Sequence, residues 1–292
     1  MMKDRLVNTG KIRLQVREYA NSAETIIFLH YGGGNLMMWQ DVVPFFQDDF
    51  HVLLIDLRGH GRSDKPRENY HIDDMAEDIL GVMDALGLGK VHVVGSSLGA
   101  EVGLSMAANY PDIVLSLVCE GALFNESGPY GLWKGTQDAF ASYVKEKLEL
   151  LRNRPEKAFN SIDEIVAEKK LFFTKHGWWN ETMEAVVRYD AIEREDGKFV
   201  ESWGRIALQY TKHYLYYNFG DYYQRVQCPL LMMPDEIPGQ DEKELSIMNA
   251  LFGFVKHGEI IRVPSWVHPF GWMITPEAGS QAVRSFLEEI RL

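Results

Sequence analysis

This sequence has few cysteines, which excludes a disulfide-rich secreted protein and argues against a metal-binding protein. The chain has 292 residues and two cysteines, Cys119 and Cys228, which are too few for the disulfide framework of a small secreted protein. Neither cysteine belongs to a CxxC motif, and the sequence has no HExxH motif or His/Cys cluster at ligand spacing. We therefore expect two buried free thiols in a reducing compartment and no bound metal.

Long apolar runs and an excess of positive charge are missing as well. No segment approaches the 18 or so consecutive apolar residues of a membrane span, and the opening stretch MMKDRLVNTGKIRLQV has no apolar signal-peptide core. The formal net charge of −12 argues against binding to nucleic acid or to an anionic membrane. These features predict a cytoplasmic protein with no nucleic acid or membrane partner, and they leave a homodimer open.

Apolar runs alternate with helix-like stretches in the first part of the chain. After a predicted hairpin about residues 8–10, the runs are TIIFLH (25–30), HVLLIDL (51–57), KVHVVG (90–95) and VLSLVC (114–119). Such runs are typical of buried parallel strands. Because helical patterns over 72–86 and 98–109 separate the later runs, the chain is predicted to form an α/β fold with a mostly parallel, doubly wound sheet.

Residues 122–226 break this alternation. They contain helix-like stretches and many aromatic residues, but no apolar run of the same kind. The sheet pattern returns with PLLMM (229–233), a helix near 241–252, the run EIIRV (259–263) and a closing helix from Pro276. We therefore predict a core domain of residues 1–121 and 227–292, with a helical cap of residues 122–226 inserted into it.

A GxSxG motif, Gly95-Ser96-Ser97-Leu98-Gly99, lies between a predicted strand and a predicted helix. Its glycines allow a turn too tight for larger residues. This is what a nucleophile elbow requires, because the turn projects a serine hydroxyl from the sheet and aims the next backbone N–H at the same point. The motif makes Ser97 the candidate nucleophile and the Leu98 N–H a candidate oxyanion donor.

At these residues the sequence resembles the α/β-hydrolase family, and the resemblance covers nearly the whole chain outside residues 122–226. FLHYGGGNLMMW (28–39) looks like the family's oxyanion loop, which implies Gly32, or else Gly33, as the second N–H donor. Tyr31 stands where the family commonly has glycine. The glycines of this loop lack the GxGxxG spacing of a dinucleotide site, so no cofactor is predicted.

A second segment, IDLRGHGRSDKP (55–66), resembles the family's segment after the fourth strand. The resemblance implies that Asp56, Arg58 and His60 organise a loop and take no part in the chemistry. His30 is likewise expected to support the oxyanion loop through hydrogen bonds.

The candidate base comes from the family's chain order of serine, acid and histidine, which places the histidine after the last strand. His268 follows the run EIIRV, and Pro276 opens the final helix eight residues later, as in many relatives. The resemblance therefore implies His268 as the general base.

Two carboxylates compete for the acid of the triad. The family usually places the acid just past the seventh strand, here LLMMPDEIPGQDE (230–242), which implies Asp235, with Glu236 or Asp241 as further alternatives. A second family arrangement places the acid after the sixth strand, which implies Glu120 in LVCEGALF. The sequence does not decide between these positions.

The implied activity is that of a cofactor-independent serine hydrolase, most simply a carboxylesterase. In such an enzyme a neutral imidazole activates the serine, the acid orients the ring, and two N–H groups bind the oxyanion. Serine at position 97 excludes relatives with an aspartate nucleophile, such as haloalkane dehalogenases. The many aromatic residues of the predicted cap favour a medium-sized hydrophobic or aryl acyl substrate.

Two alternatives stay open at this point. Relatives with the same triad hydrolyse a carbon–carbon bond in a vinylogous diketone, and Arg188, Arg194 and Arg205 are available to bind the polar groups of such a substrate. Other members of the fold bind a ligand without turning it over. Ester hydrolysis that is lost on Ser97→Ala would separate the enzymes from the binding protein.

Overall fold

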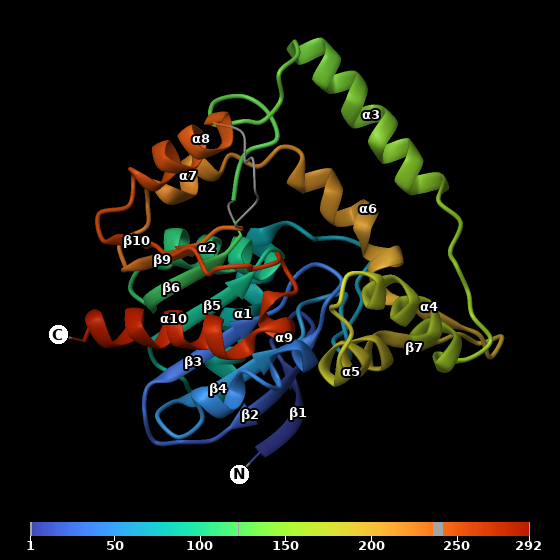
Figure 1. The fold of residues 1–292 in the computed structure, drawn as a ribbon, viewed down its shortest axis with the longest axis horizontal. Coiled ribbons are helices and arrows are strands. Elements are labelled where there is room, and N and C mark those ends of the chain that lie inside the picture. Colours follow the sequence, from blue (N-terminus) through green and yellow to red (C-terminus); the bar gives the residue numbers. More distant parts are fainter. Residues whose placement is uncertain (1, 122, 236–241, 292) are drawn as a thin grey trace.

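The computed structural model describes residues 2–121, 123–235 and 242–291. Within this part of the chain eight strands form one sheet: β1 (Met2–Asn8), β2 (Arg13–Tyr19), β3 (Thr25–Leu29), β4 (His51–Ile55), β5 (Val91–Ser96), β6 (Val114–Glu120), β9 (Leu230–Met233) and β10 (Gly258–Ile260). Their order in the sheet is β1-β2-β4-β3-β5-β6-β9-β10 (Figure 1). The β1–β2 and β2–β4 pairs are antiparallel and the others are parallel, which confirms the predicted α/β fold.

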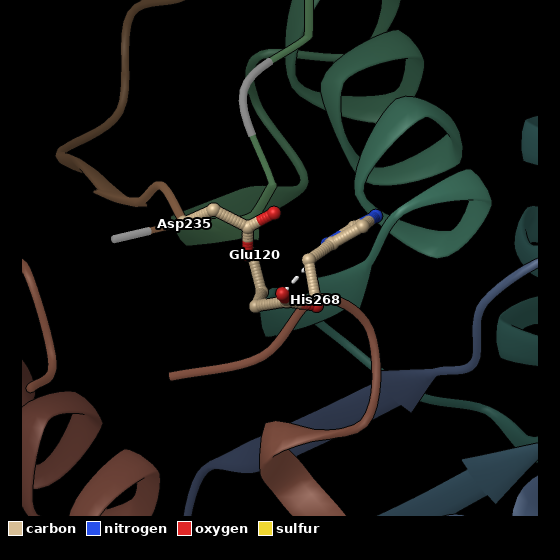
Figure 2. Close-up of side chains that lie close together, drawn as sticks. All are labelled: Glu120, Asp235 and His268. Atoms are coloured by element: carbon tan, nitrogen blue, oxygen red, sulfur yellow. Dashed lines mark hydrogen bonds and ion pairs between the residues drawn. The ribbon is translucent and has the colours of Figure 1, made fainter. Parts of the chain in front are cut away.

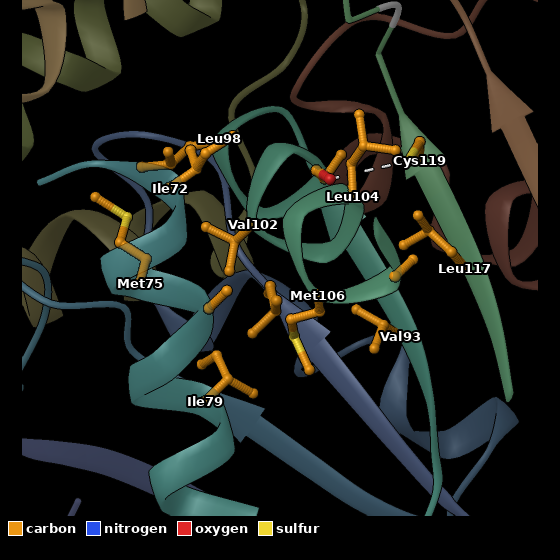
Figure 3. Close-up of a cluster of buried hydrophobic side chains, with 14 of the residues drawn as sticks. Ile72, Met75, Ile79, Val93, Leu98, Val102, Leu104, Met106, Leu117 and Cys119 are labelled. Atoms are coloured by element: carbon orange, nitrogen blue, oxygen red, sulfur yellow. Dashed lines mark hydrogen bonds between the residues drawn. The ribbon is translucent and has the colours of Figure 1, made fainter. Parts of the chain in front are cut away.

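One face of the sheet packs against helices α1 (Ile72–Leu86) and α2 (Leu98–Asn109). Alternate residues of a strand point to opposite faces, and Ile27 and Leu29 of β3 belong to the core on this side. Figure 3 shows side chains of α1, α2, β5 and β6 meeting in this core.

The opposite face packs against α9 (Gly271–Ile274) and α10 (Pro276–Glu289). Ile26 and Phe28 of β3 belong to this second core. Since helices cover both faces, the central strands are buried along most of their length and are mostly apolar, which gives the runs seen in the sequence.

Local sequence signals set the ends of the helices. The His71 side chain accepts a hydrogen bond from the Asp73 N–H and caps the start of α1. Gly87, with a φ of 64°, ends α1 in the left-handed conformation that favours glycine. Pro276 occupies the first turn of α10, where its missing N–H costs no hydrogen bond.

The segment predicted to be a cap contains helices and a short hairpin. The helices described in it are α3 (Gln137–Asn153), α4 (Ile162–Lys175), α5 (Glu181–Asp190), α6 (Ser202–Tyr214) and α7 (Phe219–Tyr223). They join β6 to β9, and Figure 1 shows α3 to α6 to one side of the sheet. The predicted boundary residue 122 lies outside the described residues.

The hairpin in this segment was not predicted from the sequence. It pairs β7 (Ala191–Glu193) with β8 (Phe199–Glu201) in antiparallel register. Each strand has three residues, too few to show a period-two pattern. The sequence does contain one hairpin signal, the turn pair Asp196–Gly197, whose glycine has a φ of 75°.

Two further predictions can be compared with the structure at the residue level. The run predicted over 259–263 is a strand only over Gly258–Ile260. Cys119 and Cys228 are both buried, and both are free thiols. In the described residues, the helices are too short or too polar to cross a bilayer.

Candidate active site

The predicted site residues come from the carboxyl ends of neighbouring parallel strands. Ser97 follows β5, Glu120 is the last residue of β6, Asp235 follows β9, and His268 lies in the segment after β10. The sheet order places β5, β6, β9 and β10 side by side. In open α/β sheets this edge is where ligands bind, and the fold brings four residues that are far apart in the sequence to it.

The turn that carries Ser97 is strained and closely packed. Ser97 has a φ of 51° and a ψ of −116°, a conformation rare for a residue with a side chain. A Cβ atom on Gly95 would lie 2.3 Å from the Gly99 carbonyl oxygen, and one on Gly99 would lie 2.1 Å from the Leu29 carbonyl oxygen. Both glycines of the motif are therefore required by close backbone approach.

The imidazole of His268 is held by Glu120. Its Nδ1 atom lies 2.7 Å from Oε1 of Glu120 (Figure 2). Glu120 is fully buried and also accepts hydrogen bonds from the Ser96 hydroxyl at 2.5 Å and the Trp266 indole N–H at 3.0 Å. Because an ionised carboxylate only accepts hydrogen bonds, Nδ1 carries the proton and Nε2 is left as the basic nitrogen.

Burial and the neighbouring charges act in opposite directions on His268. Burial lowers the pKa of the imidazole, whereas the charge and the hydrogen bond of Glu120 raise it, with smaller contributions from Asp235 and Glu101. The net result is a pKa above the ordinary value of 6.5.

Asp235 also lies near His268, but its hydrogen bond is to the backbone. It accepts a hydrogen bond from the backbone N–H of His268, and burial raises the pKa of its carboxyl. Its Oδ1 atom is buried and has no hydrogen-bond partner among the described residues. The structure thus brings both predicted carboxylates to His268, with Glu120 on the ring nitrogen and Asp235 on the backbone. The alternatives Glu236 and Asp241 lie outside the described residues.

The side chains of Glu120, Asp235 and His268 could also form a metal site. One ligand atom from each of Glu120, Asp235 and His268 lies within 4.8 Å of the other two. However, the oxygens of Glu120 already accept hydrogen bonds from Ser96, Trp266 and His268, which a metal ion would have to displace. The hydrogen bonds therefore favour an acid that orients a histidine over a metal ligand.

The loop predicted to bind the oxyanion is held by hydrogen bonds of two histidines, His60 and His30. The N–H of Gly33 donates to Nε2 of His60 at 2.9 Å, so it is not free to bind an oxyanion. This leaves Gly32, the first choice from the sequence, as the candidate donor. A Cβ atom on Gly32 would lie 3.7 Å from Leu98 Cδ2, so the two candidate donors belong to adjacent segments.

His30 and the segment after β4 have structural contacts. His30 donates from Nδ1 to the Tyr31 carbonyl at 2.7 Å and accepts at Nε2 from the Leu57 N–H at 3.0 Å. Burial lowers the pKa of His30 to about 4, so the ring is neutral at pH 7. Asp56 accepts from the Leu36 N–H at 2.7 Å and from the Arg62 N–H at 2.9 Å. These contacts organise the loops, as expected.

A cavity of about 180 Å³ is lined by the predicted nucleophile and the predicted base. It is lined by Ser97, His268, Asp235, Glu101, Glu244, Gly121, Leu123, Phe124, Tyr214 and Phe219. Its wall is both aromatic and acidic, whereas the sequence predicted a hydrophobic pocket.

Glu101 is the residue of this wall that sequence reasoning missed. It is 4% exposed, and both of its carboxylate oxygens lie 2.8 Å from the Tyr210 hydroxyl. Burial raises the pKa of Glu101 to about 8. The signal was available, because residues four apart on a helix share one face and α2 begins directly after Ser97.

A second, larger cavity of about 300 Å³ adjoins the oxyanion loop. It is lined by Gly32, Gly33, Trp203, Phe173 and Phe270, among other residues. The Trp203 ring lies against the loop, at 2.9 Å from the place of a Cβ atom on Gly32. Other aromatic residues of the cap pack among themselves, such as Trp133 and Tyr143, whose rings stack at 5.2 Å.

Two arginines considered for substrate binding are engaged elsewhere. Arg188 is exposed and forms ion pairs with Asp163 and Glu184, and Arg194 pairs with Glu156 and Asp196. Neither arginine is among the residues that line the cavity with Ser97.

Comparison with known proteins agrees with this architecture. The sequence profile of the family described as alpha/beta hydrolase fold matches residues 24–161. The crystal structure of E-2-(acetamidomethylene)succinate hydrolase superposes with a TM-score of 0.75 and 23% sequence identity, covering 99% of this chain and 100% of that one. The chain has the α/β-hydrolase fold.

Curated relatives match this chain over part of their length. The 2-(acetamidomethylene)succinate hydrolase of Mesorhizobium japonicum is 40% identical over 114 residues, which are 39% of this chain and 41% of that protein. The 3-oxoadipate enol-lactonase 2 of Acinetobacter baylyi is 36% identical over 87 residues, which are 30% of this chain and 33% of that protein. These alignments span about two fifths or less of the relatives.

Proposed function

We propose that this chain belongs to the α/β-hydrolase family and is a serine hydrolase, with Ser97 as nucleophile, His268 as general base and Glu120 as the acid. The observation that carries the proposal is the 2.7 Å contact between Nδ1 of His268 and Glu120, which leaves Nε2 as the base in the cavity that also holds Ser97. Asp235 then supports the His268 backbone and takes no part in orienting the ring.

The proposed reaction follows from these positions. Nε2 of His268 takes the proton of Ser97 as the hydroxyl oxygen attacks an acyl carbon. The Leu98 and Gly32 N–H groups stabilise the oxyanion of the tetrahedral intermediate. His268 then gives the proton to the leaving group, and an acyl-serine ester remains. Water, activated by the same nitrogen, releases the acid, so the cycle needs no cofactor.

The bond we propose to be cleaved is an ester of a medium-sized, partly aromatic substrate. Phe124, Phe219 and Tyr214 line the cavity beside Ser97 and offer an apolar surface to such a group. Two of the relatives, a 2-(acetamidomethylene)succinate hydrolase and a 3-oxoadipate enol-lactonase, are compatible with acyl chemistry. Two of the arginines available for carbon–carbon hydrolysis, Arg188 and Arg194, form ion pairs elsewhere and do not line the cavity with Ser97.

Hydrolysis of p-nitrophenyl butyrate and of an aryl ester tests the proposal. Wild type is compared with Ser97→Ala, Glu120→Gln and Asp235→Asn, and circular dichroism verifies that each variant is folded. Activity that is lost in Ser97→Ala and Glu120→Gln, and retained in Asp235→Asn, supports the triad. A folded wild type that hydrolyses neither ester would contradict an esterase and favour a ligand-binding role.

A further inference from the structure

Glu101 has no role in the proposed reaction, yet it belongs to the wall of the same cavity. It lies four residues after Ser97 in α2, and it is almost completely buried. A buried carboxyl is costly unless it is paired. Its presence beside the nucleophile therefore calls for a partner or a function.

The partner of Glu101 in the structure, Tyr210, uses only part of the hydrogen-bonding capacity of the carboxyl group. Tyr210 has one hydroxyl proton, so its contact with both oxygens amounts to one shared hydrogen bond. In its ionised form, which a bound cation favours, the carboxylate has about four acceptor positions. Tyr210 itself is fixed by the Tyr214 ring, which stacks on it at 5.4 Å, so the carboxyl is held in place beside the cavity.

The rest of the wall has the chemistry that suits a cation. The described residues that line the cavity include two further carboxylates, Asp235 and Glu244, and no lysine or arginine. They also include the rings of Phe124, Tyr214 and Phe219. Aromatic rings attract ammonium groups through their quadrupole, and like charges repel a carboxylate.

We propose that Glu101, held by Tyr210, determines specificity by binding an ammonium group on the part of the substrate that lies in this cavity. The inference rests on the proposed function only in placing the substrate beside Ser97. It adds to that function a substrate class, esters that carry a primary amine, and it disfavours esters that carry a carboxylate at the same place.

Ionisation of Glu101 gives this proposal a measurable consequence, the release of a proton when the cation binds. Burial raises the pKa of Glu101 to about 8, so most of the carboxyl is protonated at pH 7. A bound cation favours the ionised form, and binding at pH 7 must therefore release a proton. The titratable groups that face Glu101 are His268, Tyr210, Tyr214 and Tyr217. A Glu101→Gln variant keeps all of these, so the difference between the two proteins isolates Glu101.

The test measures binding without turnover. Butylammonium, 1-pentanol and butyrate are each titrated calorimetrically into full-length wild type and Glu101→Gln at pH 7, in buffers of different ionisation enthalpy. Glu149→Gln, an equal charge change at an exposed position of α3, is the control. We expect butylammonium to bind at least about tenfold more tightly than the other two, with proton release. Glu101→Gln should lose both effects, and Glu149→Gln should retain them.

Two results would overturn the inference. One is equal or weaker binding of butylammonium relative to pentanol or butyrate in wild type, which requires no variant to fold. The other is ammonium binding with unchanged affinity and proton release in a folded Glu101→Gln protein. Because these titrations need no hydrolysis, an inactive wild type that still binds butylammonium through Glu101 would contradict the proposed esterase and leave this inference standing.

Discussion

His268 Nδ1 and Glu120 Oε1 lie 2.7 Å apart, so Glu120, the last residue of β6, orients the ring of the candidate base. Asp235, which follows β9, contacts the backbone of the same histidine. Only a carboxylate on the ring nitrogen can fix the tautomer and stabilise the imidazolium. This difference in the atom contacted separates two carboxylates that the sequence left equivalent, and it leads to the first prediction.

Removing the negative charge of Glu120 should damage catalysis far more than removing that of Asp235. We predict that Glu120→Gln lowers kcat for p-nitrophenyl butyrate by about 10⁴, as in an aligned protease triad, and that Asp235→Asn lowers it by no more than about tenfold. Steady-state kinetics on both folded variants checks this. A large loss in Asp235→Asn with an active Glu120→Gln would assign the acid to Asp235.

The pH dependence of kcat/KM should reflect the raised pKa of His268. The imidazole must be neutral to act as a base, and Glu120 favours its protonated form. We therefore predict that kcat/KM of wild type rises with pH through an apparent pKa above 6.5. In Glu120→Gln the lowering effect of burial remains without this opposing charge, so the residual activity should rise through a lower apparent pKa. An unchanged profile in the variant would contradict the coupling.

The close approach of α2 to β3 should make Gly99 intolerant of a side chain. A Cβ atom there would lie 2.1 Å from the Leu29 carbonyl oxygen, which belongs to rigid backbone. We predict that Gly99→Ala lowers the free energy of unfolding by about 3 kcal/mol or more. The control is Gly89→Ala, because nothing lies within 4 Å of its added methyl group, and there we expect a change of less than about 1 kcal/mol. Urea denaturation measures both, and equal stabilities would refute the packing argument.

Trp203 should limit the size of the acyl group. Its ring lies against Gly32 and lines the larger cavity of about 300 Å³. Trp203→Ala opens this space toward the oxyanion loop. We predict that the ratio of kcat/KM for p-nitrophenyl octanoate to that for the butyrate ester rises by about tenfold, the scale of one or two extra buried methylenes. The same ratio in wild type and variant would show that the acyl chain lies elsewhere.

The strand-to-helix turn at Ser97 and the sheet could be predicted from the sequence because their signals are local. The elbow needs glycines at 95 and 99, and strands covered on both faces need continuous apolar runs. The sequence could not decide between Glu120 and Asp235, because both follow strands that end at the same edge. The choice depends on side-chain direction, which tertiary packing by Trp266 and Ser96 determines.

Glu101 shows a different limit of sequence reasoning. Its helical spacing from Ser97 was visible in the sequence, but the partner that makes burial tolerable, Tyr210, lies 109 positions later in the chain. The spacing indicates the helix face of Glu101, but its burial depends on a tyrosine hydroxyl that the sequence does not place beside it. The hairpin of β7 and β8 was missed for a simpler reason, since strands of three residues have no measurable period.

Covalent labelling of the nucleophile tests the central claim most directly. Wild type and each variant are incubated with diethyl p-nitrophenyl phosphate, and intact and peptide mass spectrometry identify the modified residue. The account predicts one diethylphosphoryl group on Ser97, no label in Ser97→Ala, slow labelling in Glu120→Gln and near-normal labelling in Asp235→Asn. Labelling of a folded wild type at another residue, or equal rates in Glu120→Gln and wild type, would contradict a triad of Ser97, His268 and Glu120.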